Sequence, residues 1–110
     1  MRLIPTLLAV ATLALGTASY AAGVADIHAK LGLNCESCHG PDKKGEVTTA
    51  TCTNCHAVDA LVEKTKNVKP TNPHVSPHYG KDLDCTNCHM GHAESENFCN
   101  QCHQFDYKVP

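Results

Sequence analysis

One short cysteine–histidine motif occurs four times in this sequence of 110 residues. Each copy has two cysteines with two residues between them, and a histidine directly after the second cysteine. The copies are Cys35, Cys38 and His39; Cys52, Cys55 and His56; Cys85, Cys88 and His89; and Cys99, Cys102 and His103. The pattern C-x-x-C-H is the attachment signature of c-type haem. Two thiols at this spacing reach one edge of a porphyrin, and the next imidazole becomes the proximal iron ligand. The motifs therefore predict four covalently bound haem c groups.

Eight cysteines can also form disulfides or bind zinc. An exported chain can hold four disulfides, and four C-x-x-C pairs can hold two zinc ions with four thiolates each. Neither use requires a histidine after every second cysteine. The sequence favours haem attachment and leaves disulfides and zinc sites to be tested.

The chain has as many histidines outside the motifs as inside them. They are His28, His74, His78 and His92. A lone imidazole is usually a solvated surface residue, but four haems need four distal ligands and these four match that number. Met90 adjoins the proximal His89 and cannot reach the other face of that haem. The sequence therefore predicts two histidine ligands on every iron.

Spacing constrains which haem each distal histidine serves. His92 follows His89 by three residues, so it cannot wrap to the other face of the third haem. We predict that His92 binds a different haem, which brings two haems close together. The short gap from Cys88 to Cys99 indicates that the third and fourth haems are also close. The other pairings stay open.

Few regular elements are expected around these residues. Apolar residues at helical spacing from Val24 to Leu31 predict a short helix that carries His28 and stops at Gly32. A second short helix is predicted over residues 57–66.

Turns and loops are predicted for the rest of the chain. Two prolines stiffen an extended loop over residues 72–80, which we expect to present His74 and His78 to two different haems. The charged segment 40–45 is predicted to be a surface turn.

Residues 22–110 contain 17 side chains of Val, Ile, Leu, Met, Phe and Tyr, too few for an ordinary core. Small exported domains compensate with disulfides, metals or large cofactors. The predicted fold is a small multihaem cytochrome, mostly coil with a few short α-helices wrapped around four c-type haems.

Charge excludes some partners. Residues 22–110 hold 8 Lys, no Arg and 11 acidic residues, a net charge of 8 − 11 = −3. Binding of nucleic acid or anionic lipid needs a basic face. We therefore predict no nucleic acid among the partners.

The first 21 residues read as a cleaved signal peptide. Arg2 precedes an apolar run over residues 3–16, and small residues lead up to Ala21. The run is short for a bilayer crossing, which takes about 20 residues. We expect export to the periplasm with no retained membrane segment, leaving residues 22–110 as one tetrahaem domain and a monomer.

The order of motifs and extra histidines resembles that of the small tetrahaem cytochromes c. It is also similar to the tetrahaem domain of periplasmic flavocytochrome c fumarate reductases, and the likeness covers residues 26–103. The resemblance implies four closely packed low-spin haems that transfer electrons in the periplasm of a respiring bacterium. It also implies that His28, His74, His78 and His92 occupy the distal ligand positions.

These observations predict an electron carrier and not an enzyme, because an iron with two imidazole ligands has no open site for substrate. The first function is a periplasmic shuttle between a membrane quinol-oxidising cytochrome and terminal reductases in anaerobic respiration. The second is a dedicated electron-donating subunit of a separate flavoprotein reductase. The third is a haem-based reductase of nitrite, hydroxylamine or metal ions, which would need an open iron. Contacts with redox partners are expected to be transient and electrostatic.

Overall fold

The computed structural model describes residues 22–110, and the predicted signal peptide lies outside this range. Four short α-helices and two 3₁₀ turns are connected by coil, and no strand is present within these residues. The elements are α1 (Val24–Lys30), α2 (Cys35–His39), α3 (Thr49–Thr53), α4 (Val58–Lys64), η1 (Cys85–Asn87) and η2 (Phe98–Gln101). None of these helices has the length and apolar character needed to span a membrane.

Helices α1 and α4 confirm the two helices predicted from apolar spacing. The prediction of turns elsewhere is wrong at α2 and α3. Helix α2 is fixed by a capping box in which Asn34 Oδ1 accepts the Ser37 N–H at 3.1 Å and the Asn34 N–H donates to Ser37 Oγ. Such five-residue helices depend on local caps and not on a repeating apolar pattern, so periodicity does not detect them.

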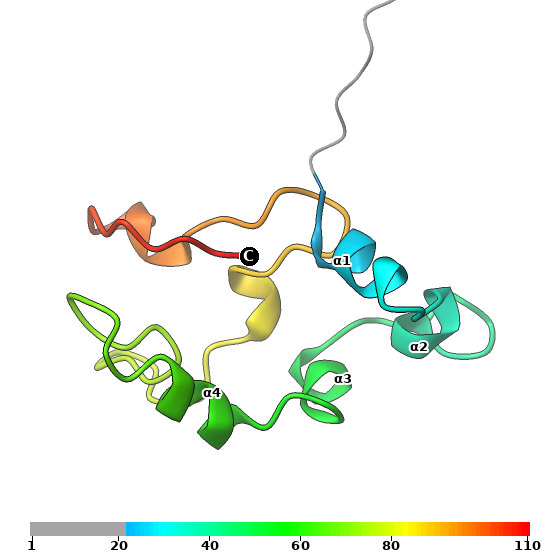
Figure 1. Ribbon diagram of the computed structural model, residues 1–110, viewed down its shortest axis with the longest axis horizontal. Coiled ribbons are helices and arrows are strands. Elements are labelled where there is room, and N and C mark those ends of the chain that lie inside the picture. The colour runs from blue at the N-terminus through cyan, green and yellow to red at the C-terminus, as the bar shows by residue number, and fades with distance from the viewer. Residues whose placement is uncertain (1–21) are drawn as a thin grey trace, which may run out of the picture.

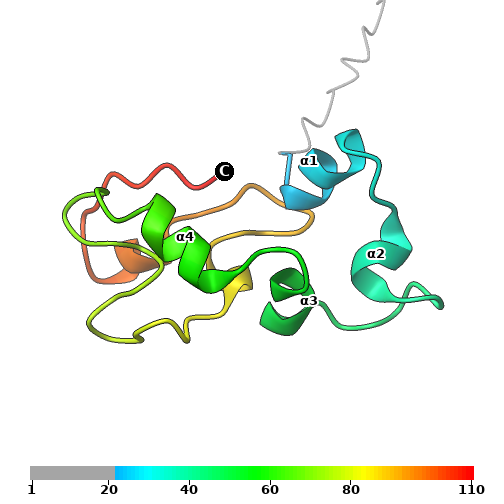
Figure 2. The ribbon, with the colours of Figure 1, turned by 60° about the horizontal axis from the view of Figure 1, so that its bottom comes forward.

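The described chain has no hydrophobic side chain that is buried, and therefore no core of its own. Several large apolar residues are exposed to solvent, and Leu31 is 72% exposed. Figures 1 and 2 show the helices spread along a curved path, and of the described elements only α3 and η1 pack closely against each other. The fold class predicted from the sequence, mostly coil with a few short helices, is confirmed.

Long-range hydrogen bonds hold the curved chain together. The N–H groups of Val24 and Ala25, in the first turn of α1, donate to the carbonyls of Met90 and Gly91 at 2.8 and 2.9 Å. These carbonyls accept hydrogen bonds from backbone N–H groups that have no partner within the helix, because they lie in its first turn. They also place α1 beside the segment that carries His92.

Two further ties connect distant parts of the chain. Thr49 Oγ1, in α3, donates to Asp84 Oδ1 at 2.7 Å and accepts from the backbone N–H of Cys85 at 3.2 Å. The Tyr107 hydroxyl donates to the carbonyl of Thr71 at 2.6 Å and so ties down the C-terminal segment. That segment returns toward the middle of the chain in Figure 1.

Candidate haem centres

Each attachment motif is folded as a single helical turn. The first motif forms α2. In the other three, the backbone N–H of the histidine donates to the carbonyl of the first cysteine of its motif, at 2.9 Å each time. Residues four apart on a helical turn lie on the same face. The local fold therefore puts a thiol and an imidazole of each motif on one face, as haem attachment requires.

Every motif histidine faces one histidine from outside the motifs. The ring centroids are 6.1 Å apart for His39 and His92, 6.0 Å for His56 and His28, 6.4 Å for His89 and His74, and 6.0 Å for His103 and His78. All eight histidines are used once in these pairs. We number the pairs as the first to fourth sites, in the order of their motifs.

The separations fit one metal ion between the rings of each pair. A metal–imidazole bond is about 2.0 Å long and the bonded nitrogen lies about 1.1 Å from its ring centre, so two imidazoles on opposite sides of one ion have centres about 6.2 Å apart. The observed values of 6.0 to 6.4 Å agree with this arrangement. The residues therefore fit a metal that takes two axial imidazoles.

Two cavities accompany the four pairs. The larger has a volume of about 1380 Å³ and is lined by the histidines of the first three sites and by the cysteines of their motifs. The smaller, of about 500 Å³, is lined by His78, His103, Cys99 and Cys102. The larger volume is about 2.8 times the smaller. The smaller pocket thus corresponds to the fourth site, and the larger cavity corresponds to the first three sites together.

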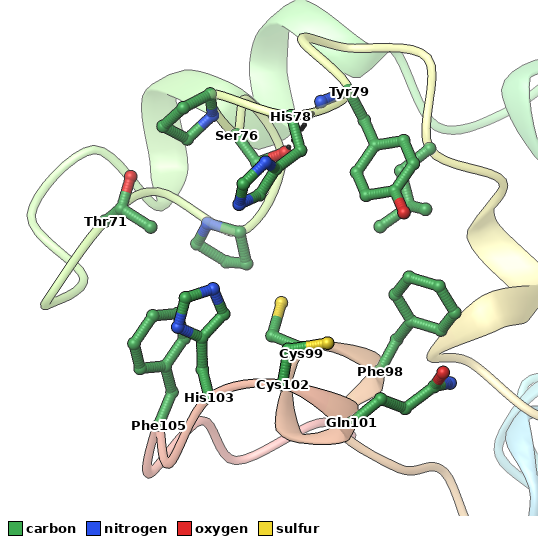
Figure 3. Close-up of a pocket in the computed structure, with 13 residues that line it drawn as sticks. Thr71, Ser76, His78, Tyr79, Phe98, Cys99, Gln101, Cys102, His103 and Phe105 are labelled. Atoms are coloured by element: carbon green, nitrogen blue, oxygen red, sulfur yellow. Dashed lines mark hydrogen bonds between the residues drawn. The ribbon is translucent and has the colours of Figure 1, made fainter.

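The smaller pocket shows the arrangement most clearly (Figure 3). His78 and His103 lie on opposite sides of it, and the sulfur atoms of Cys99 and Cys102 point into the space between them. The Phe105 ring stacks on His103, with ring centroids 4.5 Å apart and an interplanar angle of 11°. An apolar, aromatic wall of this kind suits a porphyrin.

The second ring nitrogen of several histidines has a defined partner. Nδ1 of His28 lies 2.8 Å from the carbonyl oxygen of Val24, and Nδ1 of His39 lies 2.8 Å from that of Gly45. His89 has the same relation to the carbonyl of Pro110, at 3.3 Å. A carbonyl only accepts, so these Nδ1 atoms carry the proton and Nε2 keeps a free lone pair. Metal-binding histidines are commonly oriented in this way.

Burial shifts the pKa values of three groups in the larger cavity in the direction that favours the uncharged form. Burial raises the pKa of the Cys88 thiol, and burial followed by the charge of Cys85 raises the pKa of Cys52. The pKa of His74 is lowered, first by burial and then by the charge of His89. A neutral imidazole is the form that binds a metal.

Disulfides and zinc sites find no support in the structure. All eight cysteines, which lie in the described part of the chain, are unpaired. Residues 22–110 bring no three histidine, cysteine or acidic side chains together as a zinc site would require.

The structure shows which motif histidine each of the other histidines faces, a question that the sequence left open. His92 faces His39 of the first motif and not the neighbouring His89, in line with the expectation that it serves another site. His74 and His78 face the third and fourth motifs. Iron ligation by these residues stays a prediction. Sequence reasoning missed the Nδ1 acceptors, because a backbone carbonyl leaves no signal in residue types.

Comparison with known proteins identifies the family. The profile of the Cytochrome c3 family matches residues 27–104. The chain belongs to this family. This cytochrome c3 family member is therefore an electron-transfer domain that binds c-type haem, as its motifs and histidine pairs indicate.

Curated relatives of this cytochrome c3 domain come from Shewanella. The acrylate reductase cytochrome subunit of Shewanella woodyi is 40% identical over 80 residues, which cover 70% of this chain and 68% of the relative. A probable fumarate reductase of Shewanella frigidimarina is 40% identical over 86 residues, 74% of this chain and 14% of the relative. The fumarate reductase (cytochrome) of the same species is 36% identical over 114 residues, 97% of this chain and 18% of the relative. The chain thus spans less than a fifth of either fumarate reductase. No solved structure matches.

Proposed function

We propose that this cytochrome carries four covalently bound haem c groups, each with two histidine ligands, and delivers electrons to a separate reductase subunit. The observation that carries the proposal is the set of four histidine pairs with ring centroids 6.0 to 6.4 Å apart, each beside one C-x-x-C-H motif. The eight motif cysteines would hold the porphyrins, and the eight histidines would hold the irons.

A haem iron with two imidazole ligands changes oxidation state with little ligand rearrangement and no open position, so it supplies electron relay and not bond chemistry. The chain's part in this relay is positioning. The short helical turns fix the motif histidines, while α1, the loop over residues 72–80 and the segment after the third motif bring in the distal histidines. Three sites share one cavity, which supports transfer between neighbouring haems.

The relatives favour a reductase subunit over a free shuttle. The chain aligns with 68% of a protein named as the cytochrome subunit of a reductase. It aligns with small parts of two fumarate reductases. A cytochrome of this kind therefore works together with a reductase in each relative, either as a subunit or as a segment. We place the protein in the periplasm after removal of residues 1–21, with the reductase and a membrane quinol-oxidising cytochrome as redox partners.

The test is to fractionate native periplasmic extract by size and to follow haem absorbance and flavin fluorescence together. The proposal expects both signals to co-elute at a size well above that of this chain. A haem peak alone at the size of a small monomer would instead indicate a diffusing shuttle.

Haem stoichiometry and ligation are tested on the same purified protein. Intact mass spectrometry is expected to show four haem additions on a chain that begins after residue 21. The reduced protein is expected not to bind carbon monoxide, since every iron has two ligands. Carbon monoxide binding would show an open iron and support a haem-based reductase instead.

A further inference from the structure

The hydroxyl of Thr65, directly after α4, has more neighbours than it has hydrogen atoms. Its Oγ1 lies 2.7 Å from the carbonyl oxygen of Leu61, 2.7 Å from Oδ1 of Asn72 and 3.0 Å from Nδ1 of His74. A threonine hydroxyl has one hydrogen to donate and two lone pairs to accept with. The position of that hydrogen therefore decides whether His74 Nδ1 is a donor or an acceptor.

The orientation of the Asn72 side chain follows from its two other partners. Its Nδ2 donates to the carbonyl of Val62 at 2.8 Å, and its Oδ1 accepts from the backbone N–H of His74 at 2.9 Å. A carbonyl needs a donor and an N–H needs an acceptor, so the amide cannot be reversed. The atom that Asn72 turns toward Thr65 is therefore an acceptor.

Both atoms at 2.7 Å from the Thr65 hydroxyl are thus acceptors. Two oxygen atoms at that distance repel unless a hydrogen lies between them, so the single Thr65 hydrogen is shared between the oxygens of Leu61 and Asn72 in a bifurcated hydrogen bond. A lone pair of Oγ1 then faces His74. Only a proton on His74 Nδ1 completes this contact, which leaves Nε2 of the neutral ring unprotonated.

We propose that Thr65 and Asn72 are positioning residues that hold His74 in the Nδ1-protonated form and thereby set the reduction potential of the third haem. The inference rests on the proposed function, because it takes His74 and His89 as the ligands of that haem. A hydrogen bond from the second nitrogen of a ligand histidine makes the imidazole more basic. A more basic ligand stabilises ferric over ferrous iron and lowers the potential of the one-electron couple.

The test compares Thr65→Val, which removes the hydroxyl at nearly constant shape, with Thr65→Ser, which retains it. Both are made in the full protein, and four haems are verified by mass before potentiometric titration. For Thr65→Val we expect one of the four potentials to rise. A tenfold weaker preference for ferric iron corresponds to about 59 mV. Thr65→Ser is expected to keep the original potential. A four-haem Thr65→Val protein with all four potentials unchanged would overturn the proposal.

A second measurement needs no variant. In the reduced, diamagnetic protein labelled with ¹⁵N-histidine, the Nδ1 proton of His74 is expected to exchange slowly with solvent by NMR. His56, His92 and His103 serve as internal controls, because no Nδ1 hydrogen bond is found for them within residues 22–110. Exchange at His74 as fast as at these residues would refute the assignment even if Thr65→Val failed to fold. Fewer than four haems in the unmodified protein would instead remove the ligation on which the inference depends.

Discussion

At the scale of single residues, the orientation of two motif histidines depends on backbone carbonyls that lie outside the C-x-x-C-H motif. The ring of His39 is held by the carbonyl of Gly45, while the N–H of Gly45 donates to the carbonyl of His39 at 2.8 Å. Two hydrogen bonds thus connect the two residues reciprocally. The close approach explains why position 45 holds a residue without a side chain.

Replacement of Gly45 by alanine is expected to damage the first site. The added Cβ would lie 2.4 Å from the carbonyl oxygen of His39, and a backbone atom cannot move aside cheaply. Overpacking of this kind costs about 1–3 kcal/mol, which chemical denaturation of the haem-loaded protein would measure. Gly91→Ala is the matched control, because its Cβ would meet no atom within 4 Å. Equal stability of the two variants would contradict the clash.

The angles between the paired rings predict the EPR spectrum of the oxidised protein. The interplanar angles are 6° and 7° at the first and third sites, 30° at the fourth and 64° at the second. In a low-spin ferric haem, parallel ligand planes split the iron d orbitals strongly and give a rhombic signal. Crossed planes leave two orbitals nearly equal in energy and give a signal with a much larger maximum g value.

The second site is therefore expected to give the largest g value, and two other sites should give rhombic signals. His28→Ala should remove the large-g signal and leave the two rhombic signals in place. Retention of that signal would mean that His28 and His56 do not form the pair with crossed planes.

At the scale of elements, the sequence predicted what depends on periodicity and missed what depends on local caps and long-range contacts. Helices α1 and α4 show an apolar face at helical spacing, whereas α2 and α3 are five-residue turns within or beside the motifs. The sequence also identified four histidines outside the motifs, one for each of the four motif histidines. It did not predict most pairings, because they bring together residues far apart in the chain, as do the hydrogen bonds that hold α1 against the carbonyls of Met90 and Gly91.

The C-terminal segment is an element without regular structure that is held by Tyr107. The hydroxyl donates to the Thr71 carbonyl, and burial raises the pKa of Tyr107 above its usual value of 10.0. A raised folded-state pKa means that the stability contributed is present below pH 10 and is lost as the pH rises through the folded pKa. We expect the protein to lose part of its stability above about pH 10.

Tyr107→Phe tests this tie. It removes one hydrogen bond, which contributes about 0.5–1.5 kcal/mol, and should lessen the alkaline loss seen in denaturation midpoints between pH 8 and pH 11. Tyr79→Phe is the control, since the described residues show no hydrogen bond from its hydroxyl and its side chain is 47% exposed. An identical alkaline profile for the native protein and Tyr107→Phe would argue against the tie.

At the scale of the whole molecule, positive charge is concentrated around the larger cavity although the chain is acidic. Five of the eight lysines in residues 22–110 line this cavity, but only three of the eleven acidic residues do. Three of these five lysines form ion pairs, with Glu36, Asp59 and Asp106. Lys64 and Lys69 line the cavity and have no ion pair within the described residues. Under the proposed function, their charges would be free to interact with the carboxylates of the haem propionates.

The variant with Lys64→Gln and Lys69→Gln is expected to lower at least one haem potential by tens of millivolts, because loss of nearby positive charge favours ferric iron. The shift should shrink as salt is added, since both side chains reach solvent. Lys30→Gln with Lys44→Gln is the control, because neither residue lines the cavity. Equal shifts in the two double variants would indicate a general charge effect with no role for the cavity.

The division into two cavities predicts how the molecule responds when one haem is lost. Residues 22–110 bury no hydrophobic side chain, and under the proposed function the haems would supply the core. Cys99→Ser with Cys102→Ser removes the two thiols proposed to hold the fourth haem, in the smaller pocket. This variant is expected to keep three haems by mass and to keep its helical signal in circular dichroism. Cys85→Ser with Cys88→Ser removes the attachment of one of the three haems that we propose for the larger cavity. This loss exposes the faces of its neighbours, and we expect fewer than three haems and a lower denaturation midpoint. If both variants retain three haems with the same midpoint, the haems do not support one another and each motif folds around its own cofactor.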